Sequence, residues 1–101
     1  MIKKENDLRF AWDSKKAAIN QKKHKIDFEE GSTVFYDENA LLIYDPDHSE
    51  TEDRFIILGI SKRTRLLVVC HCYPENANLI RIISARKATK KEAAQYAEVL
   101  R

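Results

Sequence analysis

The pattern of apolar and polar positions divides the chain into a helical first part and a strand-rich second part. Residues 15–23 are rich in good helix formers, and Asp13 or Ser14 offers an N-cap at the start of this helix. Only a few of its positions are apolar, so the helix is expected to cover little core. The short mixed run at residues 8–12 is predicted to be an edge strand.

Two capping-box patterns locate the other helices. Asp27 followed by Glu30 predicts a second helix that ends near residue 37, and Thr89 followed by Glu92 predicts a final helix. The apolar face of the final helix is predicted to consist of Ala93, Tyr96, Ala97 and Leu100.

Four apolar runs between these helices predict four further strands. The third run is nearly all apolar, as is typical of a central strand, and Gly59 in the second run indicates a bulge or a close approach. Short loops join the runs, so neighbouring strands are expected to be antiparallel, because parallel pairing needs a long crossover. The predicted strands are residues 40–44, 54–61, 66–73 and 79–85.

These elements predict an α+β fold, in which an antiparallel β-sheet carries two N-terminal helices and one C-terminal helix. The 101 residues have the usual size of one domain, which we assign to residues 1–101. Cys70 and Cys72 lie two apart on one predicted strand, so they face the same side and are expected to be core thiols in a reducing compartment. No run approaches the ~20 apolar residues that span a bilayer, so we expect a cytoplasmic protein with no membrane partner.

Charge is divided unevenly along the chain. Residues 1–53 carry 8 Lys/Arg against 13 Asp/Glu, a balance of −5, whereas residues 54–101 carry 10 against 3, a balance of +7. A basic half beside an acidic half favours local phosphate binding over wholesale coating of nucleic acid. The alternative is that both signs simply solvate the surface.

The basic residues gather where the last predicted strand runs into the final helix, over residues 81–96. Arg81 and Arg86 bracket the apolar part of this strand, and Lys87, Lys90 and Lys91 follow. Arginine carries a rigid fork of donors that suits phosphate and stays charged at physiological pH. This block closely resembles the C-terminal signature of the BrnT family of bacterial toxins.

Other landmarks match the same family pattern in order, and the resemblance spans roughly residues 10–96. One departure exists, because Lys25 stands where many relatives carry Gly after the Lys-His pair. Asp53 stands where relatives commonly carry Glu, which is a conservative change within the matching landmark Asp53-Arg54-Phe55. The matching landmarks are Phe10-Ala11-Trp12-Asp13, Lys23-His24, Phe28-Glu29-Glu30, Val34-Phe35, Asp37, Asp45-Pro46-Asp47-His48-Ser49, Asp53-Arg54-Phe55, Leu66-Leu67-Val68-Val69 and Arg81-Ile82-Ile83-Ser84-Ala85-Arg86.

The resemblance implies a RelE-like fold and a ribonuclease toxin of a type II toxin–antitoxin pair that arrests translation. It also implies a BrnA-like ribbon-helix-helix antitoxin, expected to form a complex with two copies of each chain. RNA, free or on the ribosome, would be the substrate, and operator DNA would be bound only through the antitoxin. The alternatives are a non-catalytic RNA-binding or translation-interfering module and a corepressor with its antitoxin, because the sequence offers no unmistakable acid–base pair.

The candidate catalytic residues follow from metal-independent RNA cleavage, in which the 2′-hydroxyl is the nucleophile. Arg81 and Arg86, joined by Arg54, are candidate clamps for the phosphate and the charged transition state. Five residues apart on a strand, Arg81 and Arg86 nominally point to opposite faces, unless a bulge or the strand end brings both to one site. The alternative for these arginines is an ion pair with the acidic half.

His24, His71 and Tyr96 are the candidate proton carriers. Each has a structural alternative: His24 at a helix C-terminus, His71 inside an apolar strand, and Tyr96 on the core face of the final helix. No cofactor and no metal are expected, since residues 45–53 lack the EF-hand spacing and its turn glycine. Further cations expected to bind RNA are Lys23, Arg63, Arg65, Lys87 and Lys90.

Overall fold

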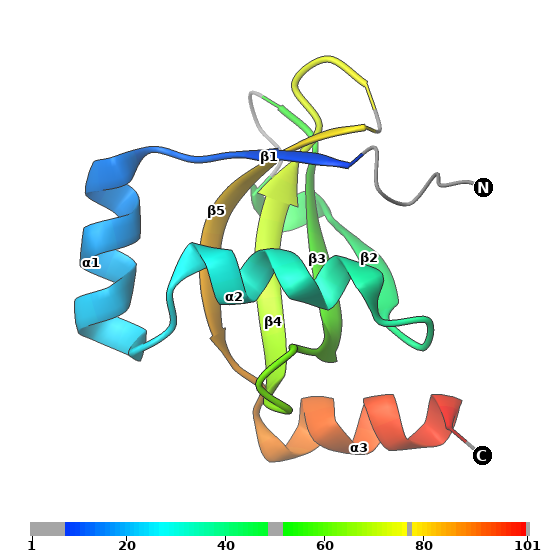
Figure 1. Cartoon of the computed structure of the whole chain (residues 1–101). Coiled ribbons are helices and arrows are strands. Elements are labelled where there is room, and N and C mark those ends of the chain that lie inside the picture. Colours follow the sequence, from blue (N-terminus) through cyan, green and yellow to red (C-terminus); the bar gives the residue numbers. More distant parts are fainter. Residues whose placement is uncertain (1–7, 49–51, 77, 101) are drawn as a thin grey trace, which may run out of the picture.

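A five-stranded sheet forms the centre of the computed structural model, which describes residues 8–48, 52–76 and 78–100. The strands lie in the order β1-β5-β4-β3-β2, so β4 is central, and helices lie on both sides and at one edge (Figure 1). The strands are β1 (Arg9–Ala11), β2 (Leu41–Asp45), β3 (Arg54–Ile60), β4 (Leu66–Cys72) and β5 (Leu79–Lys87). The helices are α1 (Ser14–His24), α2 (Phe28–Thr33) and α3 (Lys90–Val99), with 3₁₀ turns η2 (Val34–Tyr36) and η3 (Pro46–His48).

The sheet is mixed, which corrects the prediction of an antiparallel sheet. Strands β2 to β5 pair antiparallel as predicted, whereas β1 pairs parallel with β5, with Arg9 opposite Leu79 and Ala11 opposite Arg81. Parallel pairing needs a long connection, and here two helices and three strands separate β1 from β5 along the chain. The prediction of antiparallel pairing from short loops was correct only for strands that follow one another directly along the chain.

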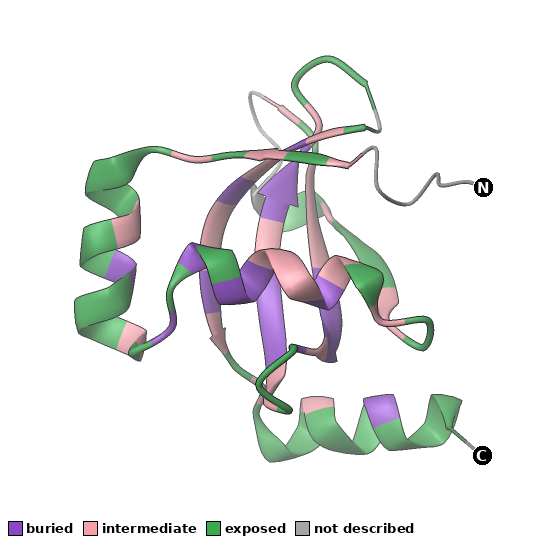
Figure 2. Ribbon diagram, viewed as in Figure 1, coloured by how far each residue is buried: buried purple, intermediate pink, exposed green. Residues whose placement is uncertain are grey.

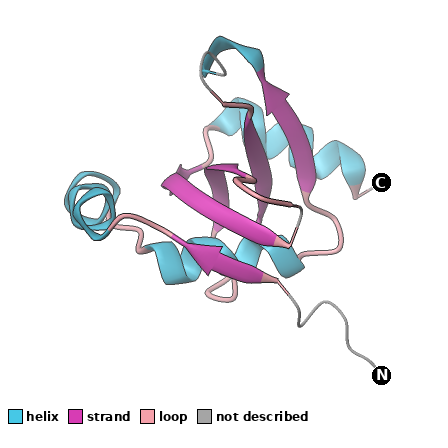
Figure 3. Cartoon of the chain, turned by 90° about the horizontal axis from the view of Figure 1, so that it is seen from above, coloured by secondary structure: helices cyan, strands magenta, loops and turns pink. Residues whose placement is uncertain are grey.

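The two faces of the sheet are covered by different helices. Figure 1 shows α2 crossing one face and α3 lying near the end of the strands, while the view from above separates α2 from α3 across the sheet (Figure 3). The larger core cluster packs under α2, and Figure 2 shows that burial is concentrated on this helix and the central strands. Its buried members are Ile26, Phe28, Val34, Ile57, Leu67, Val69, Ile80, Ile82 and Ala85.

The opposite face carries a smaller cluster, to which α3 contributes Tyr96. Tyr96 packs with Leu58 and Val68, while the rest of α3 is largely exposed (Figure 2). α3 is therefore held at a few points rather than along its length. No helix in the described ranges is long and apolar enough to cross a membrane.

The predicted caps start the helices, with one difference at α2. Asp13 caps α1 and Thr89 forms a complete capping box with Glu92. Asp27 caps α2 by accepting from the Glu30 backbone N–H, but the Glu30 carboxylate does not complete a box. It is buried instead, and accepts hydrogen bonds from Arg65 and the Ser61 hydroxyl, because a buried carboxylate needs charged or polar partners.

Gly59 marks a close approach, one of its two predicted roles. A Cβ there would lie 2.9 Å from a Val34 methyl carbon and 3.0 Å from the Ala40 Cβ. The lack of a side chain at Gly59 therefore lets η2 and the residue before β2 lie close to β3. The irregularity of the sheet lies elsewhere, between β4 and β5.

Candidate functional site

The strand register brings the three candidate arginines to one face of the sheet, opposite α2, which we call the arginine face (Arg54, Arg81 and Arg86). Arg54 on β3 and Arg81 on β5 both lie opposite Cys72 of β4, so they share a cross-strand row. Arg86 lies opposite Val68, four residues before Cys72 and thus on the same face.

A bulge in β5 makes this possible. Cys70 pairs with Ser84 and His71 pairs with Ile82, so Ile83 has no partner on β4. The extra residue puts the side chains of Arg81 and Arg86 on the same face, whereas a spacing of five residues on a regular strand would put them on opposite faces. The bulge, considered from the sequence as one way to unite the two arginines, is therefore present.

A hollow of about 260 Å³ on this face is lined by two of the three arginines, Arg54 and Arg86. Its apolar lining comes from strand residues, and its polar lining includes two guanidinium groups, a carboxylate, a hydroxyl and a thiol. The lining residues are Asp45, Arg54, Ile56, Val68, Cys70, Ile83, Ser84 and Arg86. A concave site with cationic walls can hold a phosphate diester beside a non-polar floor.

Each arginine of this face contacts a carboxylate. The Arg81 Nη2 donates to both oxygens of Glu52, at 2.5 and 2.7 Å, and the Arg54 Nη2 lies 3.8 Å from the same carboxylate. Arg86 donates from two nitrogens to the two oxygens of Glu92, at 2.8 and 2.9 Å. The ion pair with the acidic half that was foreseen as the alternative therefore exists for Arg81 and Arg54, whereas the partner of Arg86, Glu92, belongs to the basic half.

The Arg86–Glu92 pair ties the arginine face to the start of α3. Glu92 also accepts from the Thr89 backbone N–H, so one carboxylate serves both the cap and the guanidinium. The hydrogen bond from Arg86 is the main cause that lowers the pKa of Glu92 to about 2. The same bond raises the pKa of Arg86, so both groups stay charged and the guanidinium is held in a fixed orientation.

His71 lies on the opposite face and is fully buried. It packs edge-on against Phe35 and contacts Tyr73, whose hydroxyl lies 3.0 Å from its Nε2. Burial lowers the pKa of His71 to about 4, so the ring is neutral at physiological pH. The structure therefore does not bring His71 to the arginines.

His24 and Tyr96 both occupy structural positions in helices. His24 is the last residue of α1, which lies along the edge of β5, and Lys25 then ends the helix with a left-handed φ of 61°. Tyr96 is buried and its hydroxyl donates to Asp37 at 2.6 Å. Burial is the main cause that raises the pKa of Tyr96 to about 12, so its proton is held firmly.

The predicted RNA-binding cations are spread over several surfaces. Lys87 and Lys90 are exposed and flank the junction of β5 and α3, and Lys87 directly follows Arg86. Lys23 is exposed on the last turn of α1, and Arg63 is exposed in the β3–β4 turn. Arg65 is bound to the buried carboxylate of Glu30 on α2, so the structure places it on the helix-covered side.

Glu52 and Asn20 were not singled out from the sequence. Glu52 stands two residues before Arg54, a spacing that puts both on one side of an extended chain. Asn20 is buried in α1, accepts from the Ala85 N–H and donates to the Ala85 carbonyl, at 3.1 and 2.8 Å. Its side chain thereby satisfies the backbone hydrogen-bonding groups of Ala85, which lie beyond the end of the pairing with β1. No local signal in the sequence indicates this contact.

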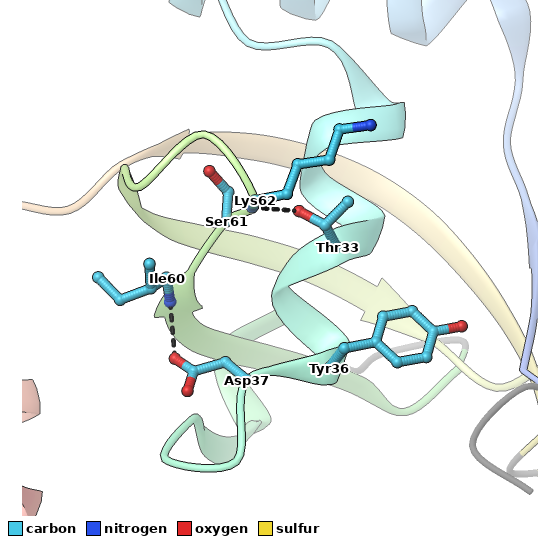
Figure 4. A pocket seen from close by; sticks show the side chains of 6 residues that line it. All are labelled: Thr33, Tyr36, Asp37, Ile60, Ser61 and Lys62. Atoms are coloured by element: carbon cyan, nitrogen blue, oxygen red, sulfur yellow. Dashed lines mark hydrogen bonds between the residues drawn. The ribbon is translucent and has the colours of Figure 1, made fainter.

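A second hollow, of about 460 Å³, lies away from the arginine face beside η2 and the β3–β4 turn (Figure 4). Two of its polar side chains are already engaged, since Asp37 accepts from the Ile60 N–H and Thr33 accepts from the Lys62 N–H. Tyr36 and Lys62 also line it, and both are exposed. It contains none of the candidate catalytic residues.

Two comparisons with known proteins found BrnT toxins. A family model described as the ribonuclease toxin BrnT of type II toxin–antitoxin systems matches residues 12–92. A solved structure, the ribonuclease toxin BrnT of Brucella abortus, is similar with a TM-score of 0.60 and 22% sequence identity, over 82% of this chain and 99% of that chain. The comparison with curated proteins gave no match.

Proposed function

This chain belongs to the BrnT family of ribonuclease toxins of type II toxin–antitoxin systems, and we propose that it cleaves RNA at its arginine face in a reaction that needs no metal ion. The observation that carries the proposal is that Arg54, Arg81 and Arg86 share one face of the sheet, where Arg54 and Arg86 line one hollow; Arg81 and Arg86 share this face because of the bulge at Ile83. Preorganised cations stabilise the extra negative charge that develops on the phosphate during cleavage.

The roles of the arginines differ according to their partners. Arg86, fixed by Glu92, presents its guanidinium at one wall of the hollow, and Arg54 lines the opposite side. A guanidinium has five N–H donors, so an arginine that binds one carboxylate retains donors for a phosphate. Lys87 and Lys90 would extend the cationic surface along the RNA backbone.

The proposal is tested by RNA cleavage with the purified chain, with and without ribosomes. We expect cleavage of single-stranded RNA, lost in Arg86→Ala and retained in Arg9→Ala, which removes an exposed arginine from the edge strand β1. RNA binding without cleavage would instead support a non-catalytic module. Growth arrest on expression without the antitoxin would argue against a corepressor.

The partner is proposed to be a ribbon-helix-helix antitoxin of the BrnA type that neutralises the toxin and represses their operon. A cationic site is most simply inhibited by an acidic segment that folds over it on binding. We expect a complex with two copies of each chain, in which the DNA-binding antitoxin forms the dimer. Mass measurement of the copurified pair tests this, and a complex with one copy of each chain would contradict it.

A further inference from the structure

The carboxylate of Glu52 contacts two of the three arginines of the arginine face. It precedes β3 and contacts Arg81 at 2.5 Å and Arg54 at 3.8 Å, so it links β3 and β5 across β4. Its side chain is about one-third exposed. The arginines therefore fix its position while solvent and a substrate can still reach it.

A hollow of about 440 Å³ opens next to this carboxylate. Phe55 and Tyr73 line it together with Glu52, and their rings lie 5.3 Å apart in an edge arrangement. Tyr44 packs edge-on against Phe55 and donates its hydroxyl to Asp53. Phe55 and Tyr73 belong to the face of the sheet that carries His71, whereas Cys72, which also lines the hollow, belongs to the arginine face. The hollow therefore lies at the end of the strands where the two faces meet. Unpaired RNA bases stack on such rings, so a base held there would have its ribose near Glu52 at this end of the sheet.

Neither of the two histidines predicted as proton carriers lines the hollows beside the arginines. His71 is buried and neutral on the opposite face, and His24 ends α1. Asp45 also lines the face, as the cross-strand partner of Arg54 on β2, and is the competing acidic group. Glu52 differs in contacting Arg81 as well as Arg54, and in bordering the hollow with the aromatic rings.

We propose that Glu52 is the general base of the cleavage reaction, a role that rests on the proposed ribonuclease function. Its carboxylate would remove the proton from the ribose 2′-hydroxyl, whose oxygen then forms a bond to phosphorus. The bond from phosphorus to the 5′-oxygen breaks with its electron pair, and that oxygen takes a proton from solvent. The products are a 2′,3′-cyclic phosphate and a 5′-hydroxyl end, and Glu52 returns its proton to water.

The pH dependence of cleavage distinguishes a base from a residue that only positions the arginines. The charged and titratable groups around Glu52 are Arg54 on β3, Cys72 on β4 and Arg81 on β5, with Asp53 and Tyr73 sharing the hollow. Burial raises the pKa of both Cys72 and Tyr73, so neither ionises in acidic solution. A fall in rate on acidification would therefore report a carboxylate.

The experiment measures single-turnover cleavage of a synthetic single-stranded RNA of mixed sequence at several pH values below neutrality, with ribosomes added if the wild-type chain needs them. Binding is measured separately, with the same RNA carrying 2′-deoxy sugars. The variants are Glu52→Gln, Glu52→Asp and Asp45→Asn, and the matched control is Glu29→Gln, an exposed glutamate on α2. Thermal melts establish that each variant is folded.

We expect Glu52→Gln to lower the single-turnover rate about 100-fold or more and to abolish its fall at low pH, with binding of the deoxy RNA retained. Glu52→Asp should regain part of the rate and the acidic fall. The inference is overturned if Glu52→Gln cleaves at the wild-type rate, if it loses activity only through weaker binding, or if Asp45→Asn alone removes the acidic fall. A wild-type chain that cleaves no RNA would instead overturn the proposed function and the base together.

Discussion

Arg81 and Arg86 lie five residues apart on one strand and yet on the same face of the sheet, because Ile83 between them has no partner on β4. Without the bulge, alternation along the strand would place one of them among the core residues under α2. The site thus depends on a single irregular residue in β5.

Replacement of either arginine by alanine is expected to abolish growth arrest while a cooperative thermal melt is retained. Each variant should lose RNA cleavage by about 100-fold or more, since a preorganised cation at the developing charge is removed. Growth on induction and cleavage of purified RNA measure the effect, with Arg9→Ala as the matched control. Full toxicity of both variants would contradict the assignment.

The Glu92 carboxylate is expected to stabilise the fold above its ordinary pKa of 4.5 and to lose this contribution as the pH falls towards about 2. Its pKa is lowered in the folded chain, so the unfolded chain binds more protons in this window and acid favours unfolding. The contribution should be on the order of 2 kcal/mol, given its partial exposure. Urea denaturation at several pH values measures it.

Glu92→Gln should remove this pH dependence and should also loosen Arg86, because the fork of charged hydrogen bonds is lost. We therefore expect slower cleavage as well as lower stability. Equal acid sensitivity of wild type and variant would show that the pair does not carry the effect.

His71 is expected to remain neutral until the pH falls to about 4, as measured by NMR titration of its ring. Because its folded-state pKa lies below its ordinary value of 6.5, stability should fall as the pH drops from 6.5 towards about 4. The loss should be on the order of 3 kcal/mol. A ring that titrates near its ordinary pKa would contradict the buried, non-catalytic role.

Tyr96→Phe is expected to leave RNA cleavage unchanged and to lower stability by about 1 kcal/mol, because one hydrogen bond to a charged group is lost. Asp37 keeps its bonds from the backbone N–H groups of Ile60 and Asn39, so it is not left unpaired. Cleavage assays and denaturant melts measure the two effects. A large loss of cleavage with normal stability would restore Tyr96 as a catalytic residue.

Chelators are expected not to affect cleavage, whereas raised salt should suppress it. Binding of phosphates by arginine and lysine releases counterions, so affinity falls steeply with ionic strength. Digestion of RNA in EDTA and across a salt series tests both points. Activity that is lost in EDTA and returns with added Mg²⁺ or Zn²⁺ would overturn the metal-independent mechanism.

The sequence by itself determined the elements whose signals are local. Asp13 or Ser14, Asp27 and Thr89 were predicted as the N-caps of the three helices, because a side-chain oxygen needs only the next turn of backbone to act as a cap. The four long strands were likewise predicted from continuous apolar runs bounded by polar loops. The family resemblance over residues 10–96 was confirmed by the match to residues 12–92.

Only the tertiary structure decided which distant groups meet. The parallel pairing of β1 with β5, the pairing of Arg65 with Glu30 and the contact of Glu52 with Arg81 join residues 29 or more positions apart in the chain. Such contacts depend on the packing of whole elements, and no spacing rule within one element predicts them. The same holds for the bulge at Ile83, which exists only relative to the register of β4 and which brings the arginines together.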